Sequence, residues 1–158
     1  MKKKEEIPLR LGVGIVLLND NNEVFVGKRI DNPKDFWQMP QGGVDKNENF
    51  LDAAKRELEE ETSIKNIILI KEIEGWLTYD LPKDLLGKIW KGKYRGQKQK
   101  WFIMKFLGNK NEIKINTKKP EFLNWKWIKP SKLPDVAVDF KINIYEKISK
   151  ELLAFKTN

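Results

Sequence analysis

Apolar and polar positions follow two different periodicities along this chain, and each periodicity predicts one kind of secondary structure. Residues 10–18 (RLGVGIVLL) form a short, β-branched apolar run, which predicts a buried strand. Residues 23–28 alternate and predict its hairpin partner, since residues 19–22 between them have the composition of a turn. Residues 36–39 predict another short strand that Pro40 ends.

Residues 41–43 (Gln-Gly-Gly) predict a tight backbone turn. A helical periodicity of apolar residues begins after them. Residues 49–62 predict the clearest helix, because Asn49 is a good N-cap and Asp52 completes a pattern similar to a capping box. Its apolar positions recur at the helical period, at Leu51, Ala54 and Leu58.

The second half of the chain predicts more strands and one more helix. Residues 67–79, 100–107 and 122–128 predict strands, and residues 138–155 predict an amphipathic helix. Strands on both sides of a helix, followed by a C-terminal helix, predict an α/β fold with a mixed sheet between helices. With 158 residues and neither repeats nor linkers, we expect a single domain over residues 1–158.

The amino-acid composition removes several kinds of chemistry. The chain has no cysteine and no histidine, which excludes disulfides, thiolate nucleophiles, the Ser-His-Asp triad and most zinc sites. An enzyme built from this sequence would use its remaining polar side chains or a metal bound by oxygen ligands. Such ligands favour hard cations such as Mg²⁺ or Mn²⁺.

The charge is positive overall and unevenly distributed. The net charge is +8, and the segment from Leu86 to Lys105 contains basic residues but no acidic ones. Residues 48–61 are the opposite, with six carboxylates against two basic residues. This segregation indicates an anionic ligand beside a metal site. No apolar run is long enough to span a bilayer, and the charged residues 1–6 do not begin a signal peptide, so we expect a cytosolic protein.

Three carboxylates share one face at the end of the predicted helix. Glu57, Glu60 and Glu61 stand at positions i, i+3 and i+4, where like charges repel and oppose the helix dipole. A divalent cation would compensate for this cost. A solvated acidic face is the more common fate of such a run, and Glu59, which points elsewhere, is expected to be a surface residue.

The surrounding residues favour the metal site. Gly42 is followed after five residues by Glu48, and after seven more by Arg56-Glu57-Leu58-x-Glu60-Glu61-x-Ser63-Ile64. This spacing resembles the Nudix box, G-x5-E-x7-R-E-U-x-E-E-x-G-U, where U is apolar. The single departure is Ser63 in place of a glycine that normally adopts a left-handed conformation, at a cost of about 1 kcal/mol.

The resemblance to the Nudix family implies a fold and a metal site. The fold would be an α/β/α sandwich with a mixed central sheet. Glu57, Glu60, Glu61 and the backbone carbonyl of Gly42 would bind Mg²⁺ or Mn²⁺, which would clamp the bridging phosphates and activate a water molecule. Arg56 and Glu48 would form a structural pair that holds the loop against the helix.

Four further stretches resemble bacterial RNA pyrophosphohydrolases and the related asymmetrical dinucleoside polyphosphate hydrolases. They are residues 36–43, 76–82, 96–102 and 120–127. The resemblance implies that Glu121 is a further metal ligand or the base that activates water, so the general base is either Glu57 or Glu121. The alternative for Glu121 is a surface carboxylate paired with a neighbouring lysine.

The expected substrate-binding residues are basic, amide or aromatic. Strand alternation would place Lys98 and Lys100 on one face, where they could meet polyphosphate oxygens; otherwise they form a polar strand entrance. The resemblance implies that Arg10 contacts phosphate and base and that Phe140 stacks on a base, although Phe140 and Tyr79 could equally be core residues. The full set is Arg10, Lys28, Arg29, Gln41, Tyr79, Gln97, Lys98, Lys100 and Phe140.

Three functions follow from these residues. The leading hypothesis is conversion of the 5′-triphosphate end of RNA to a monophosphate, which would start RNA decay; the basic segment favours it. The second is hydrolysis of dinucleoside polyphosphates such as diadenosine tetraphosphate. The third is a non-catalytic nucleotide- or RNA-binding module, which the complete carboxylate set disfavours. We expect no membrane or DNA partner, and a monomer or weak oligomer.

Overall fold

The computed structural model describes residues 3, 6–32 and 34–154. The predicted helix end at Phe155 and most of the charged N-terminal residues lie outside these ranges. The strands are β1 (Arg10–Leu18), β2 (Val24–Arg29), β3 (Trp37–Gln38), β4 (Gln41–Gly43), β5 (Ile67–Glu72), β6 (Leu77–Asp80), β7 (Gly96–Phe106) and β8 (Phe122–Ile128). The α-helices are α1 (Phe50–Thr62), α2 (Leu133–Val136) and α3 (Ile142–Ala154), and short 3₁₀ turns cover 89–92, 110–112, 130–132 and 139–141.

The strands form one mixed sheet. Its centre is the parallel pair β1 and β7, in register from Arg10 beside Gln97 to Leu18 beside Lys105. The strand order is β3-β2-β1-β7-β5, with β4 paired to β1, β6 to β7 and β8 to β2, and every pair except β1 and β7 is antiparallel. The predicted mixed sheet is therefore confirmed.

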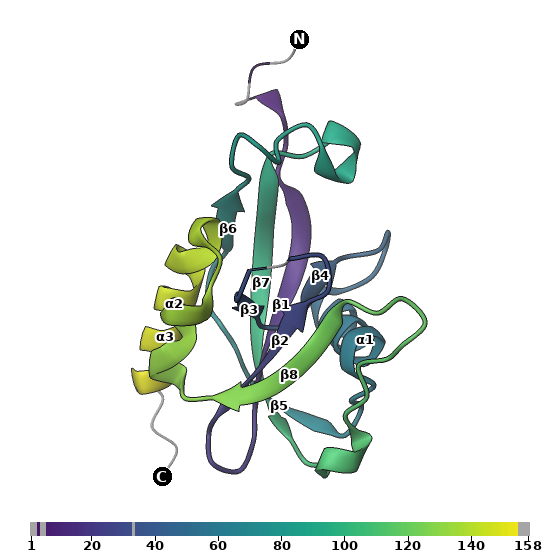
Figure 1. Ribbon diagram of the computed structural model, residues 1–158, viewed down its shortest axis with the longest axis vertical. Helices are drawn as coiled ribbons and strands as arrows, with labels where there is room; N and C mark the ends of the chain where they lie inside the picture. Colours follow the sequence, from purple (N-terminus) through teal and green to yellow (C-terminus); the bar gives the residue numbers. More distant parts are fainter. Residues whose placement is uncertain (1–2, 4–5, 33, 155–158) are drawn as a thin grey trace.

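Helices cover both faces of this sheet, with α1 on one side and α2 and α3 on the other (Figure 1). Side chains of β1 alternate between two cores: Ile15 packs in the cluster that contains Leu58 of α1, and Val16 in the cluster that contains Ile148 of α3. Because both faces are covered, β1 is apolar at nearly every position. None of the described helices is long and apolar enough to cross a bilayer.

The structure corrects several predicted boundaries. Residues 67–79 form two strands, because the chain turns at Gly75, whose φ of +84° is in the left-handed region. Residues 41–43 are not a turn but the strand β4, paired with residues 12–14 of β1. The last strand before the 110–112 turn starts earlier than predicted, at Gly96, and the C-terminal helix starts later, at Ile142.

The helix α1 begins and ends largely as predicted. The Asn49 side chain accepts a hydrogen bond from the backbone N–H of Asp52 at 2.8 Å, which caps the first turn. Ser63 follows the last turn with φ of 67°, in the left-handed conformation expected at the usual glycine position. Its backbone N–H donates to the carbonyl of Glu59, and its hydroxyl donates to the carbonyl of Lys114 at 2.9 Å. This second bond offsets part of the strain.

Candidate active site

The most unusual carboxylate of the molecule is Glu61, in the last turn of α1. Its side chain is buried, with 5% of the residue exposed, and its Oε2 atom has no hydrogen-bond partner. Burial raises the pKa of Glu61 well above its usual range, and the nearby negative charges of Glu57 and Glu121 raise it further. Because an unpartnered buried carboxylate is costly, this position favours a bound cation or proton.

Glu57 lies one turn earlier on α1 and contacts the backbone of β4. Its carboxylate packs so closely against Gly42 that a Cβ at Gly42 would overlap it. Burial raises the pKa of Glu57, while Arg56 and Arg10 lower it. The glycine at position 42 therefore serves close approach of backbone and carboxylate rather than a turn, which places the predicted carbonyl ligand beside a predicted carboxylate ligand.

Arg56 connects the loop before α1 to the acidic face of the helix. Its guanidinium donates two hydrogen bonds to Glu48, at 2.8 and 2.9 Å, and one to the carbonyl of Gly43 at 2.9 Å. This pairing lowers the pKa of Glu48 to about 2. Arg56 also donates to Glu57 at 2.9 Å and to Glu60 at 3.3 Å. The predicted structural pair of Arg56 and Glu48 is confirmed.

The acidic side chains meet in one region without forming a ready coordination geometry. Within the described ranges, no group of three or more His, Cys, Asp or Glu side chains could hold a metal ion as it stands. Glu60 is exposed and bonded to Arg56, and Glu121 lies 3.9 Å from Arg29. The donors are nevertheless all oxygen atoms, and the buried Oε2 of Glu61 lacks a partner. This donor set fits a hard divalent cation.

Two buried glutamines, Gln97 and Gln99, form a polar cluster with the partly buried Gln41 beside the carboxylates. Gln99 donates to Gln97 at 2.6 Å and to Gln41 at 3.0 Å, and it accepts from the indole N–H of Trp101 at 3.0 Å. The backbone of Gln41 also bonds the carboxylate of Glu61. The sequence predicted Gln41 and Gln97 as site residues but missed Gln99, although its spacing of two from Gln97 on a strand would have revealed it.

Two aromatic rings and a buried lysine line the α3 side of this region. The rings of Tyr79 and Phe140 are 5.5 Å apart, and Phe140 is half-buried. Burial raises the pKa of Tyr79 to about 12. Lys141 is also buried, with its ammonium 5.2 Å from the centre of the Tyr79 ring. Burial, assisted by Arg29, lowers the pKa of Lys141 to about 7, and no sequence signal indicated this lysine.

The predicted basic residues of the first two strands differ in position. Arg29 forms two 2.7 Å hydrogen bonds with Asp31 and lies near Glu121, so it flanks the carboxylates. The guanidinium of Arg10 lies 5.4 Å from the Trp90 ring, and its charge lowers the pKa of Glu57. Lys28 is paired with Asp35 at 3.5 Å, in the loop that follows β2.

Lys98 and Lys100 lie on one strand face, as predicted, but this face is opposite to the glutamine cluster. Residues 97, 99 and 101 of β7 face α3, and the even-numbered positions face the α1 side. Both ammonium groups lie 4.5 Å from the ring of Trp76. Lys98 and Lys100 therefore lie on the side of the sheet that α1 covers, across the sheet from the glutamine cluster, and their contact with polyphosphate stays a prediction.

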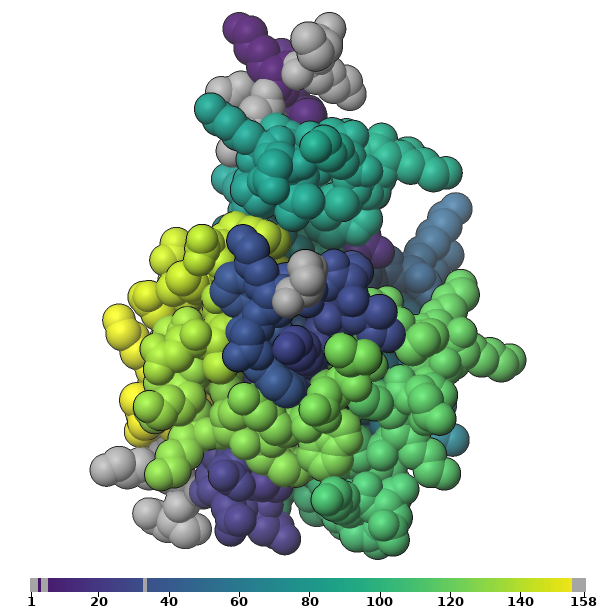
Figure 2. Space-filling model, viewed as in Figure 1, coloured from purple at the N-terminus to yellow at the C-terminus, as the bar shows by residue number. Residues whose placement is uncertain are grey.

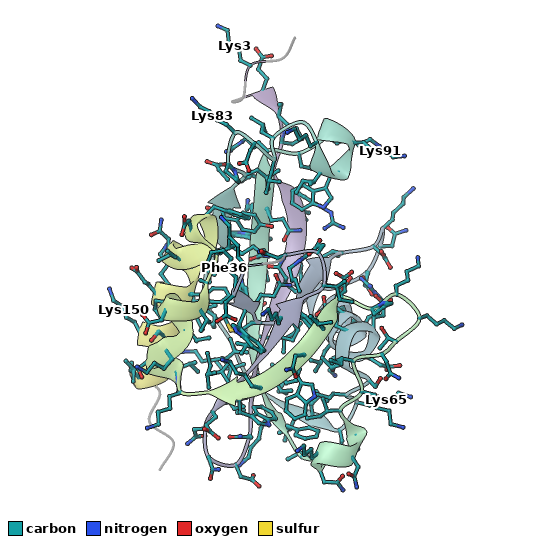
Figure 3. The ribbon with its side chains drawn as sticks, in the orientation of Figure 1. Lys3, Phe36, Lys65, Lys83, Lys91 and Lys150 are labelled. Atoms are coloured by element: carbon teal, nitrogen blue, oxygen red, sulfur yellow. The ribbon has the colours of Figure 1, made fainter. Side chains whose placement is uncertain are left out.

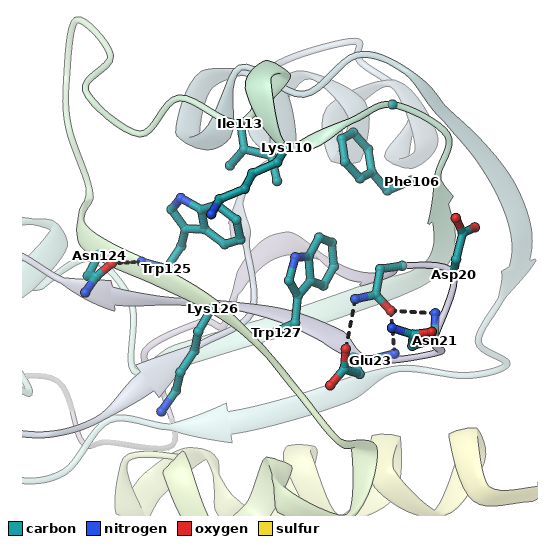
Figure 4. Close-up of a pocket in the computed structure, with 12 residues that line it drawn as sticks. Asp20, Asn21, Glu23, Phe106, Lys110, Ile113, Asn124, Trp125, Lys126 and Trp127 are labelled. Carbon is teal, nitrogen blue, oxygen red and sulfur yellow. Dashed lines mark hydrogen bonds between the residues drawn. The ribbon is translucent and has the colours of Figure 1, made fainter.

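A separate surface groove lies at the other end of β1, beside the hairpin at residues 19–23 (Figure 4). Trp125 and Trp127 line it together with Phe106 and Lys110. The carboxylates of α1 are absent from its lining. The groove is therefore distinct from the candidate active site.

The comparisons with known proteins agree with this fold. The chain matches the NUDIX domain family over residues 8–148. It is 64% identical over 149 residues to an RNA pyrophosphohydrolase of Pelagibacter ubique and 45% identical over 161 residues to one of Bradyrhizobium. The first alignment covers 94% of each chain and the second 96% of each. The chain belongs to the Nudix hydrolase family.

Solved structures support the fold independently. The Escherichia coli dihydroneopterin triphosphate pyrophosphohydrolase superposes with a TM-score of 0.73 at 21% identity, covering 94% of this chain and 99% of that one. A Caenorhabditis elegans Ap4A hydrolase superposes with a TM-score of 0.66 at 22% identity, covering 93% and 100%. At this level of identity the likeness concerns the fold alone, and it confirms the predicted α/β class with a mixed sheet.

Proposed function

We propose that this enzyme converts the triphosphorylated 5′ end of RNA to a 5′-monophosphate by removing pyrophosphate, and so promotes RNA decay. The observation that carries the proposal is the buried Glu61, whose Oε2 atom has no hydrogen-bond partner, beside Glu57 and Glu121, in a chain 64% identical to a relative named RNA pyrophosphohydrolase. Such an enzyme would act in the cytosol, as the composition predicts.

The acidic residues would hold the metal. We assign Glu57, Glu60, Glu61, Glu121 and the carbonyl of Gly42 as its ligands. Bound Mg²⁺ or Mn²⁺ would neutralise phosphate charge and lower the pKa of a water molecule. Either Glu57 or Glu121 would accept the proton of that water, and they differ in surroundings: Glu57 is bonded to Arg56 at 2.9 Å, whereas Glu121 has 45% of its side chain exposed.

Other side chains would bind the substrate. Arg10 and Arg29 flank the carboxylates and would balance the charge of the phosphate chain. The amides of Gln41 and Gln97 belong to one hydrogen-bonded cluster, which would orient phosphate or ribose oxygens. The half-buried Phe140 would stack on a base, with the buried ring of Tyr79 packed behind it, and stacking tolerates any base.

Hydrolysis of dinucleoside polyphosphates is the second candidate function. The metal ligands would recognise phosphates in either substrate, and the Tyr79–Phe140 pair would accept the adenine of diadenosine tetraphosphate as readily as an RNA base. The positive charge of the chain favours RNA, because a longer polyanion gains more from extended basic surface.

A paired assay tests this proposal. The purified protein with Mg²⁺ would be given 5′-triphosphorylated RNA and, separately, diadenosine tetraphosphate, and kcat/KM compared. We expect RNA to be preferred by about tenfold or more, which is about 1.4 kcal/mol of transition-state binding. Preference for the dinucleotide by that margin would establish the second function instead.

Two matched variants identify the source of the activity. Glu61→Gln removes the buried carboxylate and should abolish hydrolysis of both substrates. Glu59→Gln lies on the same helix but alters an exposed carboxylate that faces Lys65 at 3.8 Å, so it should behave as the wild type. If Glu61→Gln keeps full hydrolytic activity, Glu61 is not an essential metal ligand. If the wild type hydrolyses neither substrate, the non-catalytic binding module becomes the better interpretation.

A further inference from the structure

The segment between β6 and β7, residues 82–95, projects from one end of the sheet. In Figure 2 it is the teal mass above the body of the molecule, and in Figure 1 it joins the ends of β6 and β7. We call it the basic projection. It contains a single acidic residue, Asp84, and five basic residues: Lys83, Lys88, Lys91, Lys93 and Arg95.

The lysines of the basic projection carry uncompensated charge. Lys83, Lys88, Lys91 and Lys93 are exposed and form no ion pair in the part of the chain that the structure describes. Figure 3 shows Lys83 and Lys91 pointing away from the body on different sides of the projection. Arg95 differs, because it is paired with Asp80 at 2.6 Å. The four lysines are thus available to a polyanion.

The backbone of the projection is held in place at its base. The N–H of Leu81 donates to the carbonyl of Arg95 at 2.7 Å, and the N–H of Arg95 donates to the carbonyl of Pro8 at 3.0 Å. Leu85 and Ile89 pack against the core on the α3 side. The lysines are therefore displayed on an anchored segment and not on a free loop.

A left-handed turn lies at the centre of the projection. Trp90 and Lys91 have φ values of 52° and 57°, and Gly92 follows with 73°. The left-handed conformation costs about 1–2 kcal/mol for each residue other than glycine. Strained backbone of this kind gathers at functional sites. Here it directs the Trp90 ring inward to pack on the core while Lys91 remains exposed.

The turn places the projection beside the candidate active site. The guanidinium of Arg10 lies 5.4 Å from the Trp90 ring, and the same group is close enough to Glu57 to lower its pKa. Trp90 also meets Tyr94 edge-on, with ring centres 6.1 Å apart. One arginine thus connects the carboxylates to the base of the projection, and a chain leaving the site past Arg10 would meet the exposed lysines.

We propose that the basic projection binds the backbone phosphates of RNA downstream of its 5′ end. This inference rests on the proposed function and deepens it, because it identifies how the enzyme would favour an RNA chain over a free nucleotide. A dinucleoside polyphosphate has no downstream phosphodiesters, so the projection contributes nothing to its binding. The contacts are electrostatic and independent of base sequence.

The test neutralises three lysines of the projection together, as Lys88→Gln, Lys91→Gln and Lys93→Gln. For triphosphorylated RNA of roughly 20 nucleotides, we expect KM to rise about tenfold while kcat changes little. Three lost phosphate contacts should also make the slope of log kcat/KM against log salt concentration shallower by about 2. Hydrolysis of diadenosine tetraphosphate should remain within about twofold of the wild type, since its site is intact.

A matched triple variant controls for the loss of net charge. Lys129, Lys147 and Lys150 are exposed, and none of them has an ion pair among the residues described. They lie after β8 and on α3, away from the projection, and Figure 3 shows Lys150 on the left flank of the molecule, below Lys91 and on the other side from it. Their replacement by glutamine should leave KM for RNA and the salt slope close to the wild-type values.

Two results would overturn this inference alone. If the projection variant and the control variant give the same KM and salt slope, the projection does not contact RNA. If the projection variant loses activity equally on RNA and on the dinucleotide, the segment acts by supporting Arg10 instead. A wild-type enzyme that hydrolyses the dinucleotide but not RNA would be a different failure, because it would refute the proposed function itself.

Discussion

Lys141 and Glu61 are ionisable side chains buried at the candidate site, and burial disfavours the charged form of each. It raises the pKa of Glu61 and lowers that of Lys141 to about 7, while the charge of Glu61 partly stabilises the ammonium of Lys141. Arg29 acts on both, because it stabilises the carboxylate and destabilises the ammonium. Residues in such surroundings are costly to the fold, which is typical of sites organised to bind a charged ligand.

Replacement of Lys141 by methionine should therefore stabilise the protein in a pH-dependent way. The pKa of Lys141 falls from 10.5 to about 7 on folding, so between these values the unfolded chain binds a proton that the native protein lacks. The stability of the wild type accordingly rises with pH in this window, and the full cost is present below about pH 7. The gain from Lys141→Met should be largest near pH 6 and should shrink towards about pH 9.5.

Urea unfolding of both proteins at these two pH values measures the effect. Each unit of the pKa shift corresponds to about 1.4 kcal/mol of stability. An equal gain at both pH values would mean that packing rather than ionisation is responsible, and a loss of stability at both would contradict the buried neutral lysine.

At the scale of elements, hydrogen bonds connect α1 to the segments that lie next to it in the fold. The helix ends at Ser63, in a conformation that glycine adopts more easily, and the Ser63 hydroxyl compensates by bonding Lys114. In the middle of the helix, Arg56 bonds Glu48 of the preceding loop and the carbonyl of Gly43 in β4. The helix is thus tied to its neighbouring segments on both sides of Glu57, which keeps Glu57 and Glu61 in place.

Two substitutions at Ser63 separate backbone strain from hydrogen bonding. Ser63→Gly removes the strain and the hydrogen bond, whereas Ser63→Ala removes only the hydrogen bond and keeps the strain. We expect the glycine variant to be more stable than the alanine variant by about 1–2 kcal/mol. Thermal or urea unfolding of the pair measures this difference, and an alanine variant as stable as the glycine variant would show that the turn can leave the left-handed region.

At the scale of the whole molecule, a single sheet positions the residues of the candidate site. The parallel pair β1 and β7 carries Arg10 and Gln97 side by side, β4 adds Gly42, and α1 packs on the same strands. The acidic side chains lie at one end of β1 and the basic projection extends beyond it, so the two charge types found in the sequence are neighbours in space. A polyanion held by metal at its end could reach both.

This architecture leads us to expect that residues 1–158 unfold as one unit that Mg²⁺ stabilises. Without metal, circular dichroism and tryptophan fluorescence should give coincident transitions, since both cores share the central sheet. Added Mg²⁺ should raise the midpoint of the wild type by mass action and leave that of Glu61→Gln nearly unchanged. Two separate transitions would refute the single domain, and equal stabilisation of both proteins would place the metal elsewhere.

The sequence alone was sufficient to predict the fold class and the α1 helix with its Asn49 cap. It also predicted that Glu57, Glu60 and Glu61 lie on one face of this helix. These features depend on a few consecutive residues, because helical period, capping and turn chemistry act over one or two turns. The family followed from the same local spacing, and the pairing of Arg56 with Glu48 from the resemblance.

Only the tertiary structure determined which side chains each face of a strand contacts. Alternation placed Lys98 and Lys100 together, but only the packing of α1 and α3 on the two sides of β7 determined that they face Trp76 and not the glutamine cluster. In the same way, Gly42 proved to be a strand residue beside Glu57, and Lys141 a buried lysine. Burial and the side of a sheet are set by segments distant in sequence, so no local pattern encodes them.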